Sequence, residues 1–278
     1  MRGFLLALCL GLAPAAADSG ERGPAAGDPE FRLLELGGKI VRWSAPAEGL
    51  PPTITYAFLT EPRSFPGARN CDAMLPPEAA LKRSNIDMPD FRAEVRAAFA
   101  LWANAANIKF KEVPAAEAGI LIGADAKDRG RAFTNVALKS VARRAAQRST
   151  GKQNVGQIAQ SLICLNPHQR WKIGFDGDLK VYDLRFTMAH EIGHAIGLDH
   201  PSPQGQLMSF RYLDDGRTLT AGDIAGVHAL YGRKDRNAVP AAARQAVNTR
   251  AGRREADADI VQPRERTFGL GARDASER

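Results

Sequence analysis

Long apolar runs are missing from most of this 278-residue chain. No segment after residue 17 approaches the about 18 apolar residues of a membrane-spanning helix, so the sequence predicts no transmembrane segment. The one marked apolar run, Phe4 to Leu12, follows a basic residue, Arg2, and precedes small residues that end at Ala17. This order predicts a secretory signal peptide over residues 1–17, cleaved near Ala17, and a secreted or periplasmic protein.

Cysteine is scarce too. The chain has three, and Cys9 lies inside the predicted signal peptide. Removal of residues 1–17 leaves Cys71 and Cys164, and an oxidising compartment favours a disulfide between two such residues over a pair of free thiols. A bridge requires Cα atoms about 4.4 to 6.8 Å apart, a distance that the sequence does not give. We predict that Cys71 and Cys164 are joined.

Histidine is the third scarce residue, with five in the whole chain, yet three of them fall within residues 190–200. This stretch reads H-E-x-x-H-x-x-G-x-x-H. Residues four apart lie on one face of a helix, so His190 and His194 can offer ring nitrogens to one ion about 2.0 to 2.1 Å away. Gly197 can end the helix in a left-handed conformation and return His200 to the same ion. The spacing predicts a three-histidine metal site.

Three neutral imidazoles leave one tetrahedral position open, which is typical of a catalytic rather than a structural zinc site. Glu191 lies beside the ligands and is the predicted general base. An ordinary amphipathic helix can also carry H-E-x-x-H, but Gly197 and His200 argue against that interpretation. Copper and nickel bind imidazole as well, although an open site beside a carboxylate favours zinc. Outside the motif only His168 and His228 remain, so we predict one zinc ion per chain.

The residues after the motif carry a resemblance to a known family. Met208 follows the last histidine by eight positions, Tyr212 comes four later, and residues 219–232 read L-T-x-x-D-I-x-G-V-x-x-L-Y-G. Together with the histidine motif, they resemble the matrixins, the matrix-metalloproteinase branch of the metzincins, and most closely the minimal bacterial members. The resemblance spans roughly residues 38–232. It implies that Met208 is the Met-turn residue beneath the zinc and that Tyr212 helps to wall the substrate pocket.

The resemblance also implies an α+β, zincin-like fold. In such a fold a twisted mixed β-sheet with an antiparallel edge strand packs against long helices, one of which carries the histidine motif. Ser161–Asn166 would be that edge strand above the cleft, where an extended peptide can pair with it. Apolar periodicity independently predicts a helix over 90–105, with Phe91, Val95, Phe99 and Trp102 on one face, and strands over 53–58, 108–112, 120–122 and 161–166. The active helix is expected to begin near Asp183, and the last helix to run from a Thr220 cap to Gly232.

One internal segment departs from the matrixin pattern. Residues 139–160 include a basic helical stretch, Lys139–Arg148, where animal-type matrixins carry a structural zinc and calcium sites. Asp176-Gly177-Asp178 offers carboxylates that could contribute to a calcium site, but an Asp-Gly turn is the better interpretation. A cysteine switch like that of matrixin propeptides is disfavoured, because the residues around Cys71 lack its motif.

Four segments describe the whole chain. Residues 1–17 are the signal peptide, 18–37 a flexible N-terminal lead, 38–232 the catalytic domain, and 233–278 a basic tail rich in Ala and Arg. The tail carries 11 bases against 7 acids and few large apolar residues, so we expect it to be disordered. Its charge allows contact with anionic surfaces, but no nucleic-acid motif accompanies it, and no nucleic-acid partner is expected.

The sequence therefore predicts a secreted or periplasmic zinc endopeptidase that acts on protein or peptide substrates. The metal polarises the scissile carbonyl and activates water, and Glu191 takes the proton and later passes it to the leaving amine. Two alternatives stay open. An exported binding or adhesion protein could retain a vestigial zinc site, although the intact Glu191 argues against it. A zinc hydrolase of a non-peptide amide shares the motif, and only substrate profiling would separate the two enzymes.

Overall fold

The computed structural model describes residues 31–47, 50–140, 154–201, 204–214, 216 and 218–234. The predicted signal peptide, most of the predicted lead, the predicted tail from residue 235, and residues 141–148 of the basic stretch lie outside the described residues. None of the helices that the described residues form is long and apolar enough to cross a membrane.

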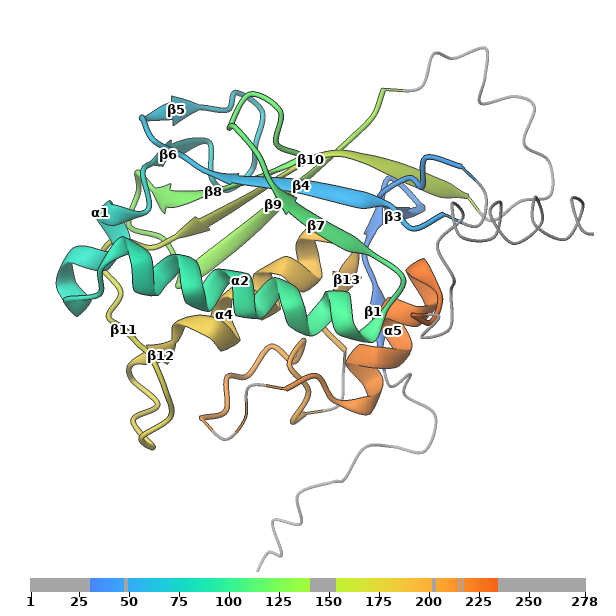
Figure 1. Ribbon diagram of the computed structural model, residues 1–278. Coiled ribbons are helices and arrows are strands. Elements are labelled where there is room, and N and C mark those ends of the chain that lie inside the picture. Colours follow the sequence, from blue (N-terminus) through green and yellow to red (C-terminus); the bar gives the residue numbers. More distant parts are fainter. Residues whose placement is uncertain are drawn as a thin grey trace, which may run out of the picture. The chain divides into compact units, whose positions relative to one another are not determined.

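A nine-stranded mixed sheet forms one layer of the molecule (Figure 1). Its main path runs β2-β3-β10-β8-β4-β7, and β10 pairs in parallel with both β3 and β8. The strands are β2 (Glu35–Leu36), β3 (Lys39–Arg42), β4 (Thr53–Phe58), β5 (Arg63–Ser64), β6 (Ala73–Leu75), β7 (Lys109–Glu112), β8 (Ile120–Asp125), β9 (Ala132–Leu138) and β10 (Val155–Leu165). The α+β class and the mixed sheet predicted from the sequence are confirmed.

The antiparallel edge strand is β9, not Ser161–Asn166. Residues 161–165 belong to β10, which pairs in parallel with β8 on one side and antiparallel with β9 on the other. Within the described chain, β9 pairs with no strand besides β10. Leu162–Leu165 is a continuous apolar run and is buried, as expected for a strand with neighbours on both sides. By contrast, β9 is only half-buried, as expected for a strand at an edge.

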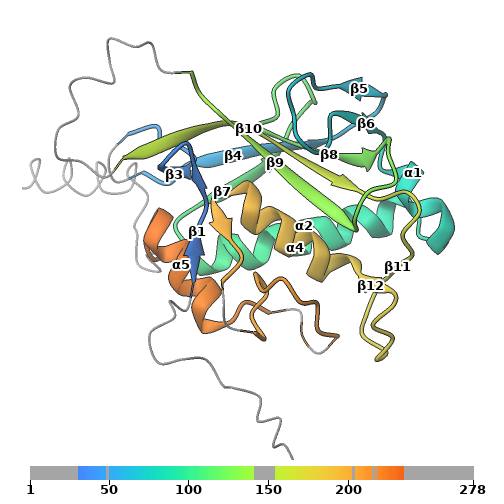
Figure 2. The ribbon, with the colours of Figure 1, turned by 180° about the vertical axis from the view of Figure 1, so that it is seen from behind.

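Helices cover one face of this sheet, with α2 and α4 side by side in both views (Figures 1 and 2). The helical elements are α1 (Glu78–Leu81), the 3₁₀ turn Lys82–Ser84, α2 (Met88–Ala105), α4 (Leu184–Ala195) and α5 (Ala221–Tyr231). The helix predicted over 90–105 begins two residues earlier, because the Asp87 carboxylate accepts a hydrogen bond from the Asp90 amide, at 2.8 Å. Its predicted apolar face is buried in the main core.

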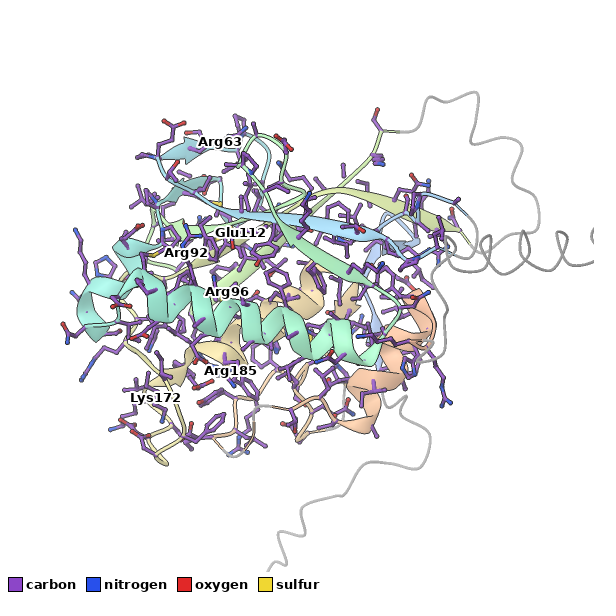
Figure 3. All side chains as sticks on the ribbon, viewed as in Figure 1. Arg63, Arg92, Arg96, Glu112, Lys172 and Arg185 are labelled. Carbon is purple, nitrogen blue, oxygen red and sulfur yellow. A yellow bond between two sulfur atoms is a disulfide. The ribbon has the colours of Figure 1, made fainter. Side chains whose placement is uncertain are left out.

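Two polar contacts fix α2 against α4. The Trp102 indole N–H donates to the carbonyl of Ala189 at 2.9 Å. Arg185 makes two parallel hydrogen bonds to the Glu94 carboxylate, at 2.8 and 2.9 Å. Figure 3 shows Arg185 below α2, on the side away from Arg92 and Glu112, which link α2 to β7. Because Glu94 is buried, this bidentate pair satisfies a carboxylate that would otherwise be costly.

The N-terminal part of the described chain differs from the prediction. The sequence places residues 31–37 in a flexible lead, whereas the structure forms β1 (Arg32–Leu33) and β2 from them. β1 pairs antiparallel with β13 (Leu198–Asp199), and β2 pairs with β3. Figure 2 shows β1 and β13 side by side below the sheet. These short strands are ordered by partners elsewhere in the fold, which local sequence patterns do not reveal.

A disulfide joins Cys71 and Cys164, whose Cα atoms lie 5.7 Å apart. Cys164 is in β10, and Cys71 lies in the loop between β5 and β6. The backbone N–H of Asn70 also donates to the Asn135 side chain at 3.0 Å. The β5–β6 loop is thus held against β9 and β10. With its sulfur bonded to Cys164, Cys71 has no thiol to offer as a cysteine switch.

The segment between β10 and α4 contains the predicted Asp-Gly turn. Gly177 has φ +84°, the left-handed conformation that favours glycine. The Lys172 ammonium contacts the carboxylates of Asp176 and Asp214 and the carbonyl of Asp178. A lysine side chain, labelled in Figure 3, therefore supplies the positive charge among these oxygens. The neighbouring strands β11 (Trp171–Lys172) and β12 (Tyr182–Asp183) pair in parallel and lead into α4.

Candidate active site

The helix that carries the histidine motif begins where the sequence predicts. One carboxylate oxygen of Asp183 accepts from the Phe186 amide at 2.8 Å, and the other accepts from the Gly174 amide at 2.7 Å. This cap starts α4 at Leu184 and places His190, Glu191 and His194 on its last two turns.

Gly197 turns the chain back toward the helix. Its φ is +107°, and a Cβ added here would lie 2.2 Å from the carbonyl oxygen of Val41. Both the conformation and the close approach require glycine. β13 follows at once and delivers His200, while β1 holds β13 through strand pairing and an ion pair between Arg32 and Asp199, at 3.2 Å.

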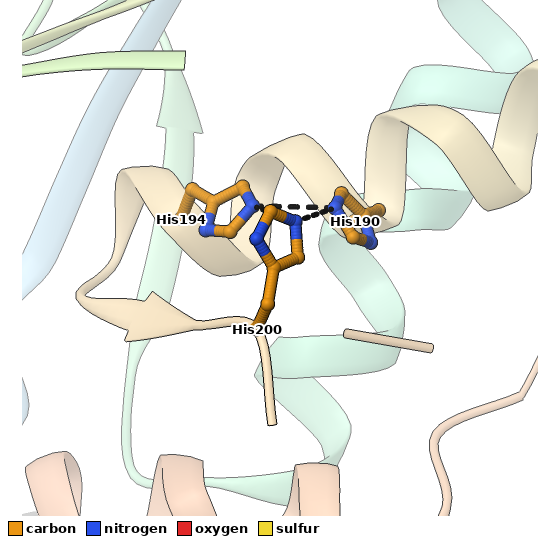
Figure 4. Close-up of side chains that lie close together, drawn as sticks. All are labelled: His190, His194 and His200. Carbon is orange, nitrogen blue, oxygen red and sulfur yellow. Dashed lines mark hydrogen bonds between the residues drawn. The ribbon is translucent and has the colours of Figure 1, made fainter. Parts of the chain in front are cut away.

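The three imidazoles meet at one point (Figure 4). The Nε2 atoms of His190, His194 and His200 lie 3.1 to 3.2 Å from one another. Nitrogen ligands placed tetrahedrally about 2.0 to 2.1 Å from one zinc ion would lie about 3.3 Å apart, so the spacing fits such an ion. Among the described residues these three form the one cluster of metal-ligating side chains.

Backbone carbonyls orient two of the rings. His190 Nδ1 lies 2.7 Å from the carbonyl oxygen of Leu207, and His194 Nδ1 lies 2.8 Å from that of Leu198. A carbonyl oxygen only accepts, so each Nδ1 carries the hydrogen and each Nε2 presents a lone pair. Lone pairs directed at one point repel one another unless a cation lies between them. The donor set therefore fits a metal ion.

Burial keeps these histidines neutral. It lowers the pKa of His190 and His200, and lowers that of His194 well below the usual value, where the two neighbouring imidazoles add to the effect. A neutral imidazole is the form that binds a metal. The three rings are thus held ready for an ion at neutral pH.

Glu191 is buried beside the ligands, with 6% of its surface exposed. Burial raises the pKa of its carboxyl group to about 7, and a hydrogen bond from Thr134 acts in the opposite direction. Such a pKa is suited to a group that takes and returns a proton near neutral pH.

Thr134, in the edge strand β9, is a neighbour of Glu191 that the sequence analysis missed. Its Oγ1 lies 2.6 Å from Glu191 Oε2 and 2.9 Å from the backbone oxygen of Glu191. The single hydroxyl hydrogen can go to the carboxylate, or to the backbone oxygen when a protonated Glu191 donates instead. The contact is satisfied in both protonation states. The signal available in the sequence was Phe133, Thr134 and Val136, aromatic and β-branched residue types that favour a strand.

The pKa of Glu191 leads to a prediction for the metal-free protein. Between about pH 4.5 and 7 the folded protein keeps the Glu191 proton while the unfolded chain releases it. The free energy of unfolding should therefore fall with rising pH across this window, by about 3 kcal/mol relative to Glu191→Gln. Denaturant titrations of the two metal-free proteins from pH 4.5 to 8 measure the difference, which cancels the histidine contributions. A difference that does not change with pH would contradict the buried, neutral carboxyl group.

Met208 lies directly beneath the histidine helix. A Cβ added at Gly193 would stand 2.2 Å from the Met208 sulfur and 3.0 Å from the Trp102 ring, so the methionine packs against the helix backbone between two ligands. Asp223 of α5 holds the loop in place, since its carboxylate accepts from the amides of Leu207 and Met208, both at 3.0 Å. The same carboxylate completes the predicted cap with Thr220.

A cleft of about 830 Å³ opens in front of the histidines. Tyr212 lies on its wall, and the rings of Tyr182 and Phe186 pack edge-on against it with centroids 4.9 Å away. The Tyr212 hydroxyl accepts from the Asp183 amide at 3.0 Å and donates to Asp214 at 2.6 Å. Phe210 is 78% exposed at the mouth of the cleft. The predicted ligands, Glu191 and Tyr212 thus line one cleft together with β9, whereas Met208 packs beneath the histidine helix.

Comparison with known proteins agrees with this geometry. A family model described as Matrixin matches residues 79–232, more than half of the chain. An interstitial collagenase from Sus scrofa is 27% identical over 157 residues, which are 56% of this chain and 31% of the collagenase. A matrilysin from Mus musculus is 29% identical over 144 residues, 51% of each protein. The chain thus spans between about a third and a half of these relatives. Since the family match runs from α1 through the histidine helix to the end of α5, this chain belongs to the matrixin family.

Proposed function

We propose that this protein is a zinc-dependent endopeptidase that hydrolyses peptide bonds in proteins or peptides. The observation that carries the proposal is the convergence of three neutral imidazole nitrogens beside the buried Glu191 carboxyl group, at the floor of an open cleft. Membership of the matrixin family supports both the metal and the reaction class. His190, His194 and His200 would hold one zinc ion per chain.

Each residue of the site has a chemical task. A zinc ion held by the three histidines would act as a Lewis acid toward the scissile carbonyl and would make water more acidic. Glu191 takes a proton from the attacking water and returns it to the leaving amine, as its pKa near 7 allows. Thr134 holds one oxygen of the Glu191 carboxyl group, which leaves the other free to accept the proton. The carbonyls of Leu207 and Leu198 orient the rings of His190 and His194, and Met208 packs against the helix backbone between these two ligands.

The edge strand β9 provides a physical route to peptide binding. The outer edge of β9 faces the cleft, and Ala132–Val136 of this strand line it. An extended peptide can add to such an edge through backbone hydrogen bonds, largely independently of its sequence. The resemblance assigned this role to Ser161–Asn166, and we now assign it to β9, which pairs with that segment.

Export is part of the proposal. The predicted signal peptide over residues 1–17 supports it, and so does the disulfide, because disulfides persist in oxidising compartments. We therefore propose a secreted or periplasmic location for the mature protein.

Unbiased peptide-library digestion tests the function. The zinc-loaded mature protein should cleave internal peptide bonds, and a chelator should abolish the cleavage, which added zinc then restores. Tight peptide binding without turnover would favour an exported binding protein. Hydrolysis of a non-peptide amide alone would favour the second alternative.

Replacement of Thr134 tests its part in the reaction. Thr134→Val keeps the shape of the side chain but removes the hydroxyl that holds the Glu191 carboxyl group, so kcat should fall about tenfold while zinc content and KM stay nearly unchanged. Thr134→Ser restores a hydroxyl and should recover most of kcat. The measurement is steady-state cleavage of one library-derived peptide by the three proteins. Equal kcat values for parent and Thr134→Val would show that the hydroxyl has no catalytic part.

A further inference from the structure

Arg131 stands at the end of the cleft where α4 begins. It immediately precedes β9, lines the cleft, and its side chain is exposed. Its guanidinium carbon lies 4.4 Å from the centroid of the Tyr182 ring. Its backbone carbonyl accepts from the Asn166 amide at 2.8 Å, which fixes the main chain. The arginine is thus held on the aromatic wall formed with Tyr182 and Tyr212.

The two arginines that line the cleft lack acidic partners among the described residues, whereas the two carboxylates have assigned roles or partners. Two carboxylates line the cleft. Glu191 is the proposed general base, and Asp199 forms an ion pair with Arg32. Two arginines line it as well, Arg131 and Arg69 of the β5–β6 loop, and neither forms an ion pair with an acid in the described part of the chain. The cleft outside the metal centre therefore offers positive charge without a partner.

A neighbouring arginine does have acidic partners. Arg129, two residues away, is held by Asp125 at 3.0 Å and Asp72 at 2.7 Å. The guanidinium of Arg131 stacks on a tyrosine face instead. A stacked guanidinium keeps its N–H edge free and oriented, and that edge matches the two oxygens of a carboxylate.

The fold also indicates which substrate residue would lie beside Arg131. Tyr182 precedes the cap of α4, and His190 follows seven residues after that cap. At a rise of 1.5 Å per residue this is about 10 Å along the helix. An extended peptide advances about 3.3 Å per residue, so about three residues separate the bond at the metal site from a side chain at Arg131.

We propose that Arg131 selects substrates with an acidic side chain two to four residues from the scissile bond, on the side that faces the start of α4. The inference rests on the proposed peptidase function and narrows it to peptides with a carboxylate at one position. Arg69, in the β5–β6 loop that lies against β9, adds positive potential to the cleft, which raises the local concentration of acidic peptides without selecting a position in the peptide.

Matched peptides test the proposal. Each set shares one cleaved sequence and carries Glu, Gln or Lys at one of the four positions on either side of the scissile bond. The parent protein should cleave the Glu peptide about 5- to 20-fold faster in kcat/KM than the Gln peptide at one position, and this ratio should shrink as salt is added. Arg131→Gln should remove the preference, and Arg131→Glu should turn it toward Lys. Arg131→Lys keeps the charge but loses the planar fork, and should keep part of the preference.

Arg63→Glu is the matched control. Arg63 is exposed on β5, lies 5.4 Å over the Phe65 ring, does not line the cleft, and is labelled at the top of Figure 3, away from α2. The control changes the net charge equally and should leave the Glu preference intact. Equal rates for Glu and Gln peptides at every position would overturn the inference while cleavage itself upheld the proposed function. A preference that survives in Arg131→Gln would overturn it too. A parent that cleaves no peptide would overturn both.

Discussion

Glu191→Ala is expected to keep one zinc ion and the native fold and to lose roughly 10² to 10⁴ in kcat, the usual worth of a positioned general base. Glu191 is not one of the three side chains that could hold the metal, and its carboxyl group is hydrogen-bonded to Thr134 rather than to a histidine. Its loss therefore removes the proton acceptor without removing a ligand. Removal of a buried carboxyl group whose one hydrogen-bond partner among the described residues, Thr134, also reaches the Glu191 backbone oxygen should not lower the melting temperature.

His194→Ala is the contrasting variant. It removes one of the three converging nitrogens, so the zinc should be lost together with the activity. Metal analysis and steady-state kinetics on both variants and the parent separate the two roles. If Glu191→Ala cleaved peptides as fast as the parent, the assignment of the general base would be wrong. If Glu191→Ala instead lost its zinc, the carboxylate would have to be counted as a ligand.

Removal of the disulfide should have the largest effect on stability. Cys71 and Cys164 are separated by 93 residues, and closing a loop of this length stabilises a protein by about 4 to 5 kcal/mol in the chain-entropy model. Both residues are fully buried, so alanine at each position adds no polar group to the core. Denaturant unfolding of the parent and the double Cys71→Ala, Cys164→Ala variant measures the difference.

Thiol labelling provides the control for that comparison. The denatured, non-reduced mature protein should show no free cysteine, because Cys9 leaves with the predicted signal peptide. Two labelled thiols would contradict the bridge. A double variant as stable as the parent would show that the bond does little to restrict the unfolded chain.

Local patterns explain how much of this molecule could be predicted. The turn at Gly197, the cap at Asp183 and the α5 cap formed by Thr220 and Asp223 depend on residues within a few positions of one another, and the structure has all three. The buried face of α2 follows from helical periodicity in the same way.

Contacts between distant segments explain what was missed. The position of β10 between β8 and β9 depends on pairing with residues 41 positions away in β8 and up to 33 positions away in β9, and an apolar run does not identify its neighbours. β1 is ordered by β13, more than 160 residues later. Thr134 and Arg131 gain their importance only when β9 is laid beside α4. Neither residue belongs to a sequence motif of fixed spacing, as the three histidines do.

Zinc titration of the metal-free protein tests the central claim most directly, because it measures peptide cleavage as a function of the zinc bound per chain. We predict no peptide cleavage without metal, a linear rise of activity with added zinc, and a plateau at one equivalent per chain. Cleavage that persists in the metal-free protein, or that rises until two equivalents have bound, would contradict a single three-histidine catalytic site.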